Sequence, residues 1–260
     1  MSRLIPWWGL LLLGAAATLQ AQYAVGGGVL ANINAHTANF RTISPDIPNC
    51  CPGFESATGF GWGIFATYDG VRLAPRLRLL AELSYRRHEA TFLQREPTTV
   101  SSPQGSATPG TFEHELRTRW STVMTALLVG YSPVEELPQF QLRLGIAAGH
   151  TLSADFQQRE RLVEPEYGYF ADTGTRTRNE YAGRIPGTAP AYLLLGLGAR
   201  YLLPLLPRNQ LALQPSISAW LGLTRLLSHI PWRAHEVVFS LGVVYAPFEL
   251  PSPLQPGTPQ

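Results

Sequence analysis

The stretch at residues 75–91, PRLRLLAELSYRRHEAT, decides the fold class. Its odd positions from 77 to 85 are apolar or aromatic: Leu77, Leu79, Ala81, Leu83 and Tyr85. Its even positions are mostly polar or charged: Arg78, Leu80, Glu82, Ser84, Arg86 and His88. Successive side chains of a strand point to opposite faces, so one face is apolar and the other charged, whereas a helix would scatter these charges. Because strands of soluble sheets average about five or six residues, this length is typical of a transmembrane barrel.

The same alternation recurs in seven other segments: residues 23–33, 58–68, 113–131, 140–153, 191–201, 211–223 and 233–247. Pro215 lies on the apolar face of one of them and disfavours that strand, since proline removes a ladder hydrogen bond. Together the segments predict an all-β fold, an eight-stranded antiparallel up-and-down transmembrane β-barrel.

The connections between these strands alternate in length. Long polar loops are expected at 36–56, 93–110 and 156–190, and short turns from 69–70 onward, at 132–139 and at 202–209. The strand ends beside the short turns carry aromatic rings, at Tyr23, Tyr68, Tyr131, Phe140, Tyr201 and Tyr245. Amphipathic rings settle at membrane interfaces, and short turns face the periplasm in such barrels. These residues therefore predict a periplasmic aromatic girdle.

The N-terminus has the features of a secretory signal peptide. Arg3 gives a positive start, residues 4–17 are apolar, and Leu19-Gln20-Ala21 forms a small-residue cleavage site. The apolar stretch is short for a membrane helix of about 20 residues, and an uncleaved anchor is the alternative. We expect a signal peptide at 1–21, the barrel at 22–248, a Pro-rich tail at 249–260 and export to the outer membrane.

Composition excludes little else. Of the 260 residues, 45% are hydrophobic and 15% charged, below the usual charged fraction of about 25%. The net charge of +2 and the lack of a basic tract give no indication of a nucleic acid partner. The expected partners are membrane lipid and, through the loops or the tail, extracellular or cell-wall components.

Charged residues on the inward strand faces predict an interior network formed by Arg78, Glu82, Arg86, Arg143, Arg200 and Glu236. Eight strands leave an interior that side chains just fill, and unpaired charges there would be costly. We therefore expect Glu82 and Glu236 to pair with arginines. The network is interpreted as a polar plug that holds the barrel together, with a gated ion path through rearranged pairs as the alternative.

The only two cysteines, Cys50 and Cys51, are adjacent in the first long loop. In an oxidising compartment two cysteines usually pair, and Pro52 favours the turned peptide that an adjacent disulfide needs. A disulfide between them is the first interpretation; free thiols and links to another chain are the others. Two cysteines supply half of a four-ligand zinc site and no HxxH or CxxC motif completes it, so neither metal nor cofactor is expected.

Residues 47–68, IPNCCPGFESATGFGWGIFATY, resemble a loop-and-strand segment of OmpA-like outer-membrane β-barrel proteins of diderm bacteria. The specific part is Asn49-Cys50-Cys51-Pro52 followed by a strand with alternating glycines. The resemblance implies an eight-stranded barrel, which many relatives join to a periplasmic peptidoglycan-binding domain. Here a Pro-rich tail follows Tyr245, so cell-wall binding by such a domain is not expected.

Three functions are weighed on these observations. The first is a structural or surface-display role through the long loops, with the aromatic cluster at 166–170 as a binding surface or an interface anchor. The second is a narrow channel or a component of a secretion or assembly system. The third is a hydrolase at the outer rim, for which Ser84, His88 and Glu82 share one face while His114 and Glu115 are expected near His88. No Gly-x-Ser-x-Gly motif is present, and no enzymatic activity is expected.

Overall fold

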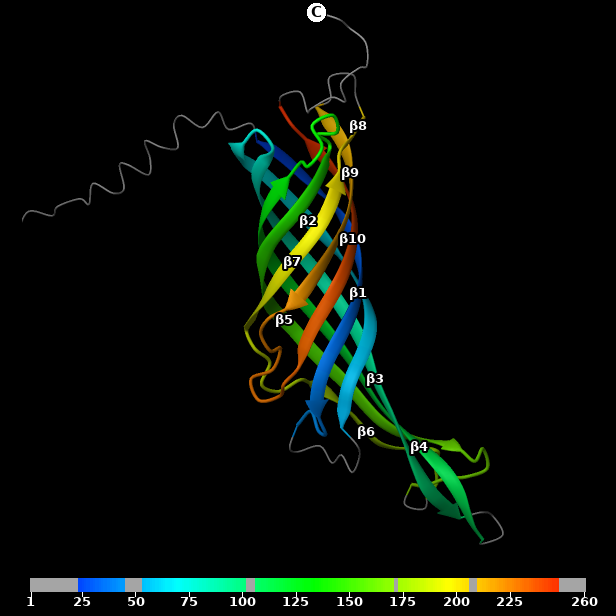
Figure 1. Cartoon of the computed structure of the whole chain (residues 1–260). Coiled ribbons are helices and arrows are strands. Elements are labelled where there is room, and N and C mark those ends of the chain that lie inside the picture. The colour runs from blue at the N-terminus through cyan, green and yellow to red at the C-terminus, as the bar shows by residue number, and fades with distance from the viewer. Residues whose placement is uncertain (1–22, 45–52, 102–105, 171–172, 206–209, 248–260) are drawn as a thin grey trace, which may run out of the picture.

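A computed structural model describes residues 23–44, 53–101, 106–170, 173–205 and 210–247 (Figure 1). These residues form ten strands: β1 (Ala24–Phe40), β2 (Phe54–Ala74), β3 (Leu77–Ser101), β4 (Ala107–Tyr131), β5 (Phe140–Glu164), β6 (Thr177–Arg184), β7 (Ala191–Tyr201), β8 (Leu203–Pro204), β9 (Leu211–Gly222) and β10 (Arg233–Tyr245). Within these ranges no helix is long and apolar enough to cross a membrane. The expected signal peptide, Cys50, Cys51 and the Pro-rich tail lie outside the described residues.

Eight of the strands close into a ring. Neighbours pair antiparallel in the order β10-β1-β2-β3-β4-β5-β7-β9, and β9 pairs with β10 to complete the circle. The chain's first and last strands meet over a long ladder that runs from Val25 opposite Tyr245 to Thr37 opposite Arg233. β6 pairs with β5 and β8 with β9 outside this ring. The predicted all-β, eight-stranded antiparallel barrel is therefore confirmed.

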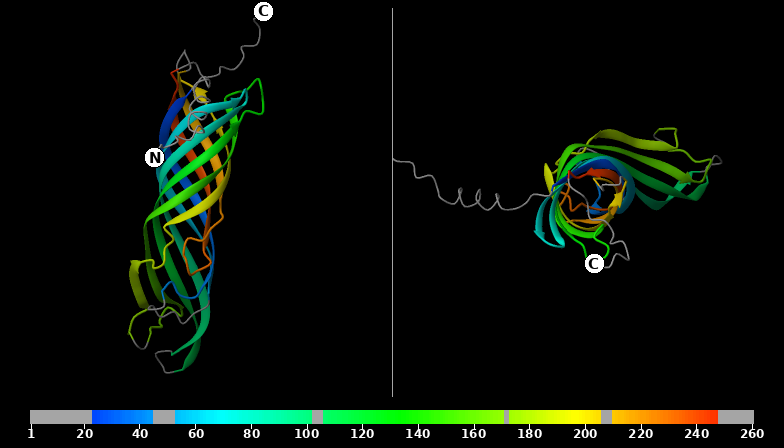
Figure 2. Two further views of the ribbon diagram at one scale, coloured as in Figure 1. Left: turned by 90° about the vertical axis from the view of Figure 1, so that its left-hand side faces the viewer. Right: turned by 90° about the horizontal axis from the view of Figure 1, so that it is seen from above.

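Two rims are named by their connections. The turn rim holds the start of β1, the end of β10 and the short connections, at the top of Figure 1; the loop rim is at the opposite end. Figure 2 shows the barrel from the side and down its axis. Between the rims, outward side chains form an apolar outer band: Val29, Phe60, Ile64, Leu83, Leu127, Leu144, Leu197, Leu221 and Leu241. Phe60 is 73% exposed and Leu197 62%, while their chain neighbours turn inward.

The strands are longer at the loop rim than the sequence analysis expects. The expected loop at 93–110 is mostly strand, because β3 continues to Ser101 and β4 begins at Ala107. The expected loop at 156–190 contains the end of β5 and all of β6. These parts of β3, β4, β5 and β6 form a four-stranded sheet beyond the barrel, here called the extension (Figure 1).

Two prolines in the extension favour a loop in sequence but are compatible with the strands that form. Pro97 lies on β3 beyond Thr91, the last β3 residue that pairs with β2, so its missing N–H group falls on an open sheet edge. Pro109 lies on β4 beyond Thr111, where pairing with β5 begins. Edge positions tolerate proline, and cross-strand ion pairs stabilise strands that lack an apolar alternation.

Two further expectations concern the turn rim. The turn expected at 69–70 is wrong: β2 continues to Ala74, the turn is at 75–76, and Asp69 points into the barrel. Pro215, which disfavoured a strand, lies inside β9 opposite Leu241 of β10. On its other side, the ladder to β7 ends at Ser216 and resumes at Leu213 with β8, so Pro215 sits in a gap of that ladder.

Gly63 should be required for the β2–β3 pairing. A Cβ atom at Gly63 would lie 2.0 Å from the carbonyl oxygen of Tyr85 on β3, which is backbone and cannot rotate away. We expect Gly63→Val to destabilise the barrel by about 1–3 kcal/mol, the usual cost of overpacking. The measurement is the temperature at which the compact gel band of unheated protein converts to the unfolded band. Ala66→Val, which points outward on the same strand, should leave that temperature almost unchanged; an equal drop for both variants would contradict the close approach.

Candidate functional site

The barrel interior is filled by layers of side chains. At the turn rim, a small apolar cluster closes the interior: Ala24, Leu202, Ala212, Val244 and Ala246. Each member is almost fully buried, and the cluster joins residues from both ends of the chain. Small apolar side chains therefore line the interior at this end of the barrel.

Next to this cluster, on the side toward the loop rim, lies the buried guanidinium of Arg200 on β7. Its Nη1 and Nη2 atoms donate to the carboxylate of Asp69 on β2, with an Nη1–Oδ1 distance of 3.1 Å. Its Nε atom donates to Gln141 Oε1 at 2.9 Å, and Nη1 also donates to Gln214 Oε1 at 3.2 Å. Asp69, Gln141 and Gln214 are partners that the sequence analysis missed, although Asp69 has the same inward parity as Thr67.

The next layer contains the other predicted interior charges. Arg86 donates to Glu236 Oε1 at 2.5 Å and lies 3.5 Å from Glu82 Oε1. Arg143 reaches Glu82 Oε2 at 3.7 Å. Glu82 therefore links two arginines, and Glu236 binds the first of them. Arg78 is half-buried, lies opposite Arg72 on β2, and shares a cross-strand row with Gly130 and Arg143.

The loop rim is closed by an aromatic cap. Its members are Phe40, Phe54, Phe92, Trp120 and Trp232, whose ring centroids lie 5.1–5.8 Å apart in successive pairs. Trp232 comes from the connection between β9 and β10, which folds into the barrel with Leu226, Leu227 and Ile230. The Trp232 indole Nε1 donates to His36 Nδ1 at 2.9 Å. Strand alternation does not predict this cap, because Trp232 and its apolar neighbours lie in a connection between two strands.

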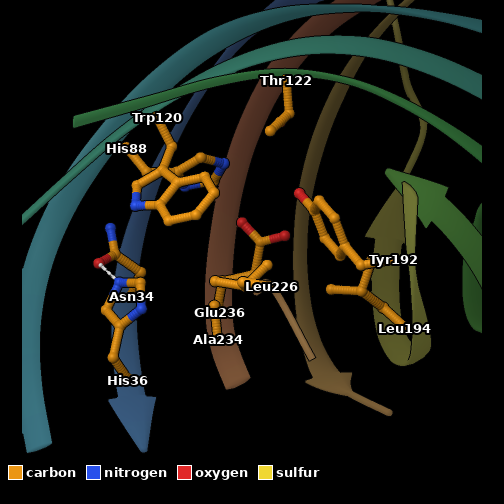
Figure 3. Close-up of a pocket in the computed structure, with 10 residues that line it drawn as sticks. All are labelled: Asn34, His36, His88, Trp120, Thr122, Tyr192, Leu194, Leu226, Ala234 and Glu236. Carbon is orange, nitrogen blue, oxygen red and sulfur yellow. Dashed lines mark hydrogen bonds between the residues drawn. The ribbon is translucent and has the colours of Figure 1, made fainter. Parts of the chain in front are cut away.

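Only a small space remains between the cap and the charged layer. Figure 3 shows the Tyr192 hydroxyl, Thr122 and the Glu236 carboxylate facing this space, with His36 hydrogen-bonded to Asn34 beside it. Its volume of about 20 Å³ accommodates about one water molecule. The interior therefore holds no substrate-sized cavity here.

The residues considered for hydrolysis do not assemble. Ser84 Oγ accepts a hydrogen bond from Arg86 Nε at 3.1 Å, and His88 Nδ1 lies 3.4 Å from Asn32 Nδ2. The expectation that His114 and Glu115 lie near His88 is wrong. His88 stands opposite Trp120, and His114 stands opposite Gln94, because the β3–β4 hairpin turns at the tip of the extension.

The extension carries most of the remaining charge. Glu113 accepts from Arg95 and Arg161 on the two neighbouring strands. Burial raises the pKa of Glu113, but hydrogen bonds from Arg161 and Arg95 outweigh it and hold the pKa below its usual value. The carboxylate therefore stays ionised at neutral pH.

The expected aromatic cluster at 166–170 lies in the extension. The Phe170 ring packs 5.0 Å from Phe112, and the Arg178 guanidinium lies 4.2 Å above Phe170. Arg176 fixes the same loop by donating to the carbonyl oxygens of Leu162 and Pro165. Tyr167 and Tyr169 are exposed.

The predicted girdle residues share the turn rim. Tyr68 and Tyr245 both stand opposite Val25, Tyr131 opposite Leu142, and Phe140 opposite Tyr201. The rings of Tyr23 and Tyr68 stack with centroids 6.5 Å apart. Within the described ranges, no group of three or more His, Cys, Asp or Glu residues is arranged to hold a metal ion.

Comparison with solved structures gives distant likenesses. Neisserial surface protein A shares 13% identity at a TM-score of 0.35, over 86% of this chain and 96% of that one. Outer membrane protease OmpT from Escherichia coli shares 10% identity at a TM-score of 0.34, over 88% of this chain and 97% of that one. Ail, the attachment invasion locus protein of Yersinia pestis, was solved with the heparin analogue sucrose octasulfate. It shares 9% identity at a TM-score of 0.28, over 88% of this chain and 99% of that one.

No model of a known protein family matches the sequence, and no curated protein matches it either. The resemblance to OmpA-like barrels therefore stays a prediction. The fold class rests on this chain's own strand pairing and ring closure.

Asp69 should be essential for stability. Asp69→Asn keeps the size of the side chain but leaves the buried Arg200 without its counter-charge, so we expect a loss of about 3–5 kcal/mol. Urea unfolding of the folded protein, followed by the compact gel band, measures this loss. Glu135→Gln breaks the exposed pair with Arg76 and should cost about 0–1 kcal/mol. Equal losses in the two variants would show that the Arg200 layer is not a stabilising plug.

Proposed function

We propose that the chain is an outer-membrane β-barrel with a structural and surface-display role and without catalysis. The barrel spans the membrane, the turn rim faces the periplasm, and the extension stands outside the cell as the displayed surface. The observation that carries this proposal is the combination of an apolar outer band with an interior filled from rim to rim.

The dimensions of the outer band support membrane insertion. On β10 the outward apolar side chains run from Val237 to Tyr245. Val237 and Tyr245 are eight residues apart along the strand. At about 3.4 Å per residue and a strand tilt of about 40° from the barrel axis, this stretch is about 20 Å tall along the axis. The apolar band of known outer-membrane barrels is about 25 Å tall. A soluble protein would leave this large apolar surface in water.

The filled interior supports a structural role over transport. Ions crossing the barrel would have to pass the apolar cluster at the turn rim, the Arg200 layer, the Arg86 layer and the aromatic cap. Arg86, Arg143 and Arg200 each have a carboxylate partner in these layers. The separation of Ser84 from His88 and the position of His114 likewise support a role without catalysis.

The orientation is tested by epitope accessibility on intact cells. An epitope inserted between Ser101 and Ala107, at the tip of the extension, should bind antibody without permeabilisation. The matched control, an epitope in the turn at 75–76, should bind only after the outer membrane is opened. The reverse pattern would contradict the orientation, and recovery of both proteins in the soluble periplasmic fraction would contradict membrane insertion.

The structural role is tested in planar lipid bilayers. The folded protein should give no steady ion conductance, because every layer of the interior is packed. A variant that removes two large cap side chains, Phe92→Ala with Trp232→Ala, should still give none, since the Arg200 and Arg86 layers remain. Stable single-channel steps from the wild-type protein would favour the channel alternative.

A further inference from the structure

The outward face of β3, β4 and β5 beyond the apolar band carries a repeated charge arrangement. One glutamate lies between two arginines in each of three Arg–Glu–Arg triads: Arg95–Glu113–Arg161, Arg117–Glu115–Arg159 and Arg87–Glu89–Arg119. Each triad has one carboxylate for two guanidinium groups, so each carries a net charge of +1. The three triads follow one another along β4, at Glu113, then at Glu115 and Arg117, then at Arg119.

The glutamates hold the arginines in place. Arg159 donates to Glu115 Oε2 through Nε at 2.8 Å and Nη2 at 2.6 Å, and Arg117 donates to the other oxygen of Glu115. The side chains of Glu113 and Glu115 are only 5% and 6% exposed, whereas that of Arg117 is 60% exposed. In the first two triads, buried carboxylates therefore position the guanidinium groups. In the third triad the Glu89 side chain is itself 56% exposed, so its carboxylate holds the two arginines at the surface.

The neighbouring charges do not cancel the excess. Asp155 stands between Arg119 and Arg184 in the strand register, so Asp155 and Arg184 balance each other. Glu180 lies beside the second triad, and Glu164, which accepts from the Thr111 hydroxyl, lies beside the first. The face keeps a net charge of about +1, and an arginine fork matches the geometry of a phosphate group.

Two hollows lie on this face and share Arg117 and Gln157. The larger, of about 290 Å³, is lined by Arg117, Arg159 and Tyr181. The smaller, of about 140 Å³, is lined by Arg117 and Arg119. Arginines of the second and third triads thus converge on adjoining spaces.

The position of the triads relative to the apolar outer band indicates which anion they can bind. The triads lie on the same outward face of the strands as the apolar band. On β3, for example, Arg87 and Glu89 occupy the alternate positions that follow Leu83 and Tyr85. Figures 1 and 2 show that the extension leans away from the barrel axis and projects beside the barrel when seen from above. With the apolar band in the membrane, this face lies at the level of the outer-leaflet headgroups.

We propose that the Arg–Glu–Arg triads bind the phosphate groups of phosphorylated sugar headgroups in the outer leaflet. This inference rests on the proposed membrane orientation. Bound headgroups bridge neighbouring triads and fix the extension against the membrane surface. Direct arginine–phosphate pairs are bidentate, so removal of the excess arginines should weaken binding strongly.

The test uses the folded full chain in phosphatidylcholine nanodiscs that contain bisphosphorylated or dephosphorylated lipid A. Native mass spectrometry measures the fraction of protein with lipid A bound. One arginine of each triad is replaced in a triple variant that leaves three neutral Arg–Glu pairs: Arg95→Gln, Arg117→Gln and Arg119→Gln. We expect at least a tenfold loss of bisphosphorylated lipid A binding in this variant, and weak binding of the dephosphorylated lipid by the wild type.

The matched control removes the same charge from three exposed arginines outside the triads: Arg72→Gln, Arg225→Gln and Arg233→Gln. It should bind bisphosphorylated lipid A as the wild type does. Equal binding by the wild type and the triad variant, or no preference for the phosphorylated lipid, would overturn the triad site while leaving the membrane barrel intact. If millimolar inorganic pyrophosphate displaced all of the bound lipid A, the face would be a site for soluble anions, and the proposal that it binds lipid headgroups would be overturned. Failure of the wild type to insert into the nanodiscs would overturn the proposed function itself.

Discussion

The narrow interior of an eight-stranded ring is the constraint on which the rest of this structure depends. Side chains just fill such a ring, so any charge inside it must find its counter-charge among a few inward positions. Arg200 meets this requirement with Asp69 and two glutamines, and Arg86 meets it with Glu236. Once these groups are paired, the interior has no room for a substrate and little for water. Chemistry and recognition are therefore displaced to the outside of the ring.

The same three strands serve two environments. Within the apolar band, β3, β4 and β5 present aliphatic side chains outward and polar ones inward. Beyond it, the outward positions change to arginine and glutamate, and the inward positions include Phe92, Leu116 and Leu162. The outward face thus changes from apolar to charged without interrupting the backbone ladder between β3 and β4, while the inward face also holds His114 and Glu160. Ion pairs between neighbouring strands replace lipid contact as the outward stabilisation of the extension.

The sequence predicted the barrel because the alternation of side chains along a strand is itself the geometry of the wall. It could not predict the partner of Arg200, since Asp69 lies far away in the sequence and its position across the barrel depends on strand register and tilt. The sequence of the extension favours a loop, because Pro97 and Pro109 interrupt any strand pattern and because a strand outside a membrane needs no alternation of apolar side chains. The misplacement of His114 has the same origin. A hairpin that turns at its distant tip shifts every cross-strand neighbour of His88.

The pairing of β1 with β10 has a consequence for how the chain reaches its folded state. Val25 and Tyr245 are about 220 residues apart in the sequence, so the ring closes through one of the most non-local contacts available to the chain. Contacts of this kind form slowly, because a large loop-closure entropy precedes any gain from them. Until β10 arrives, both β1 and β9 present unpaired strand edges, which readily pair with other chains. The stage at which the last strand is still missing is therefore the stage at which this protein is most prone to aggregate.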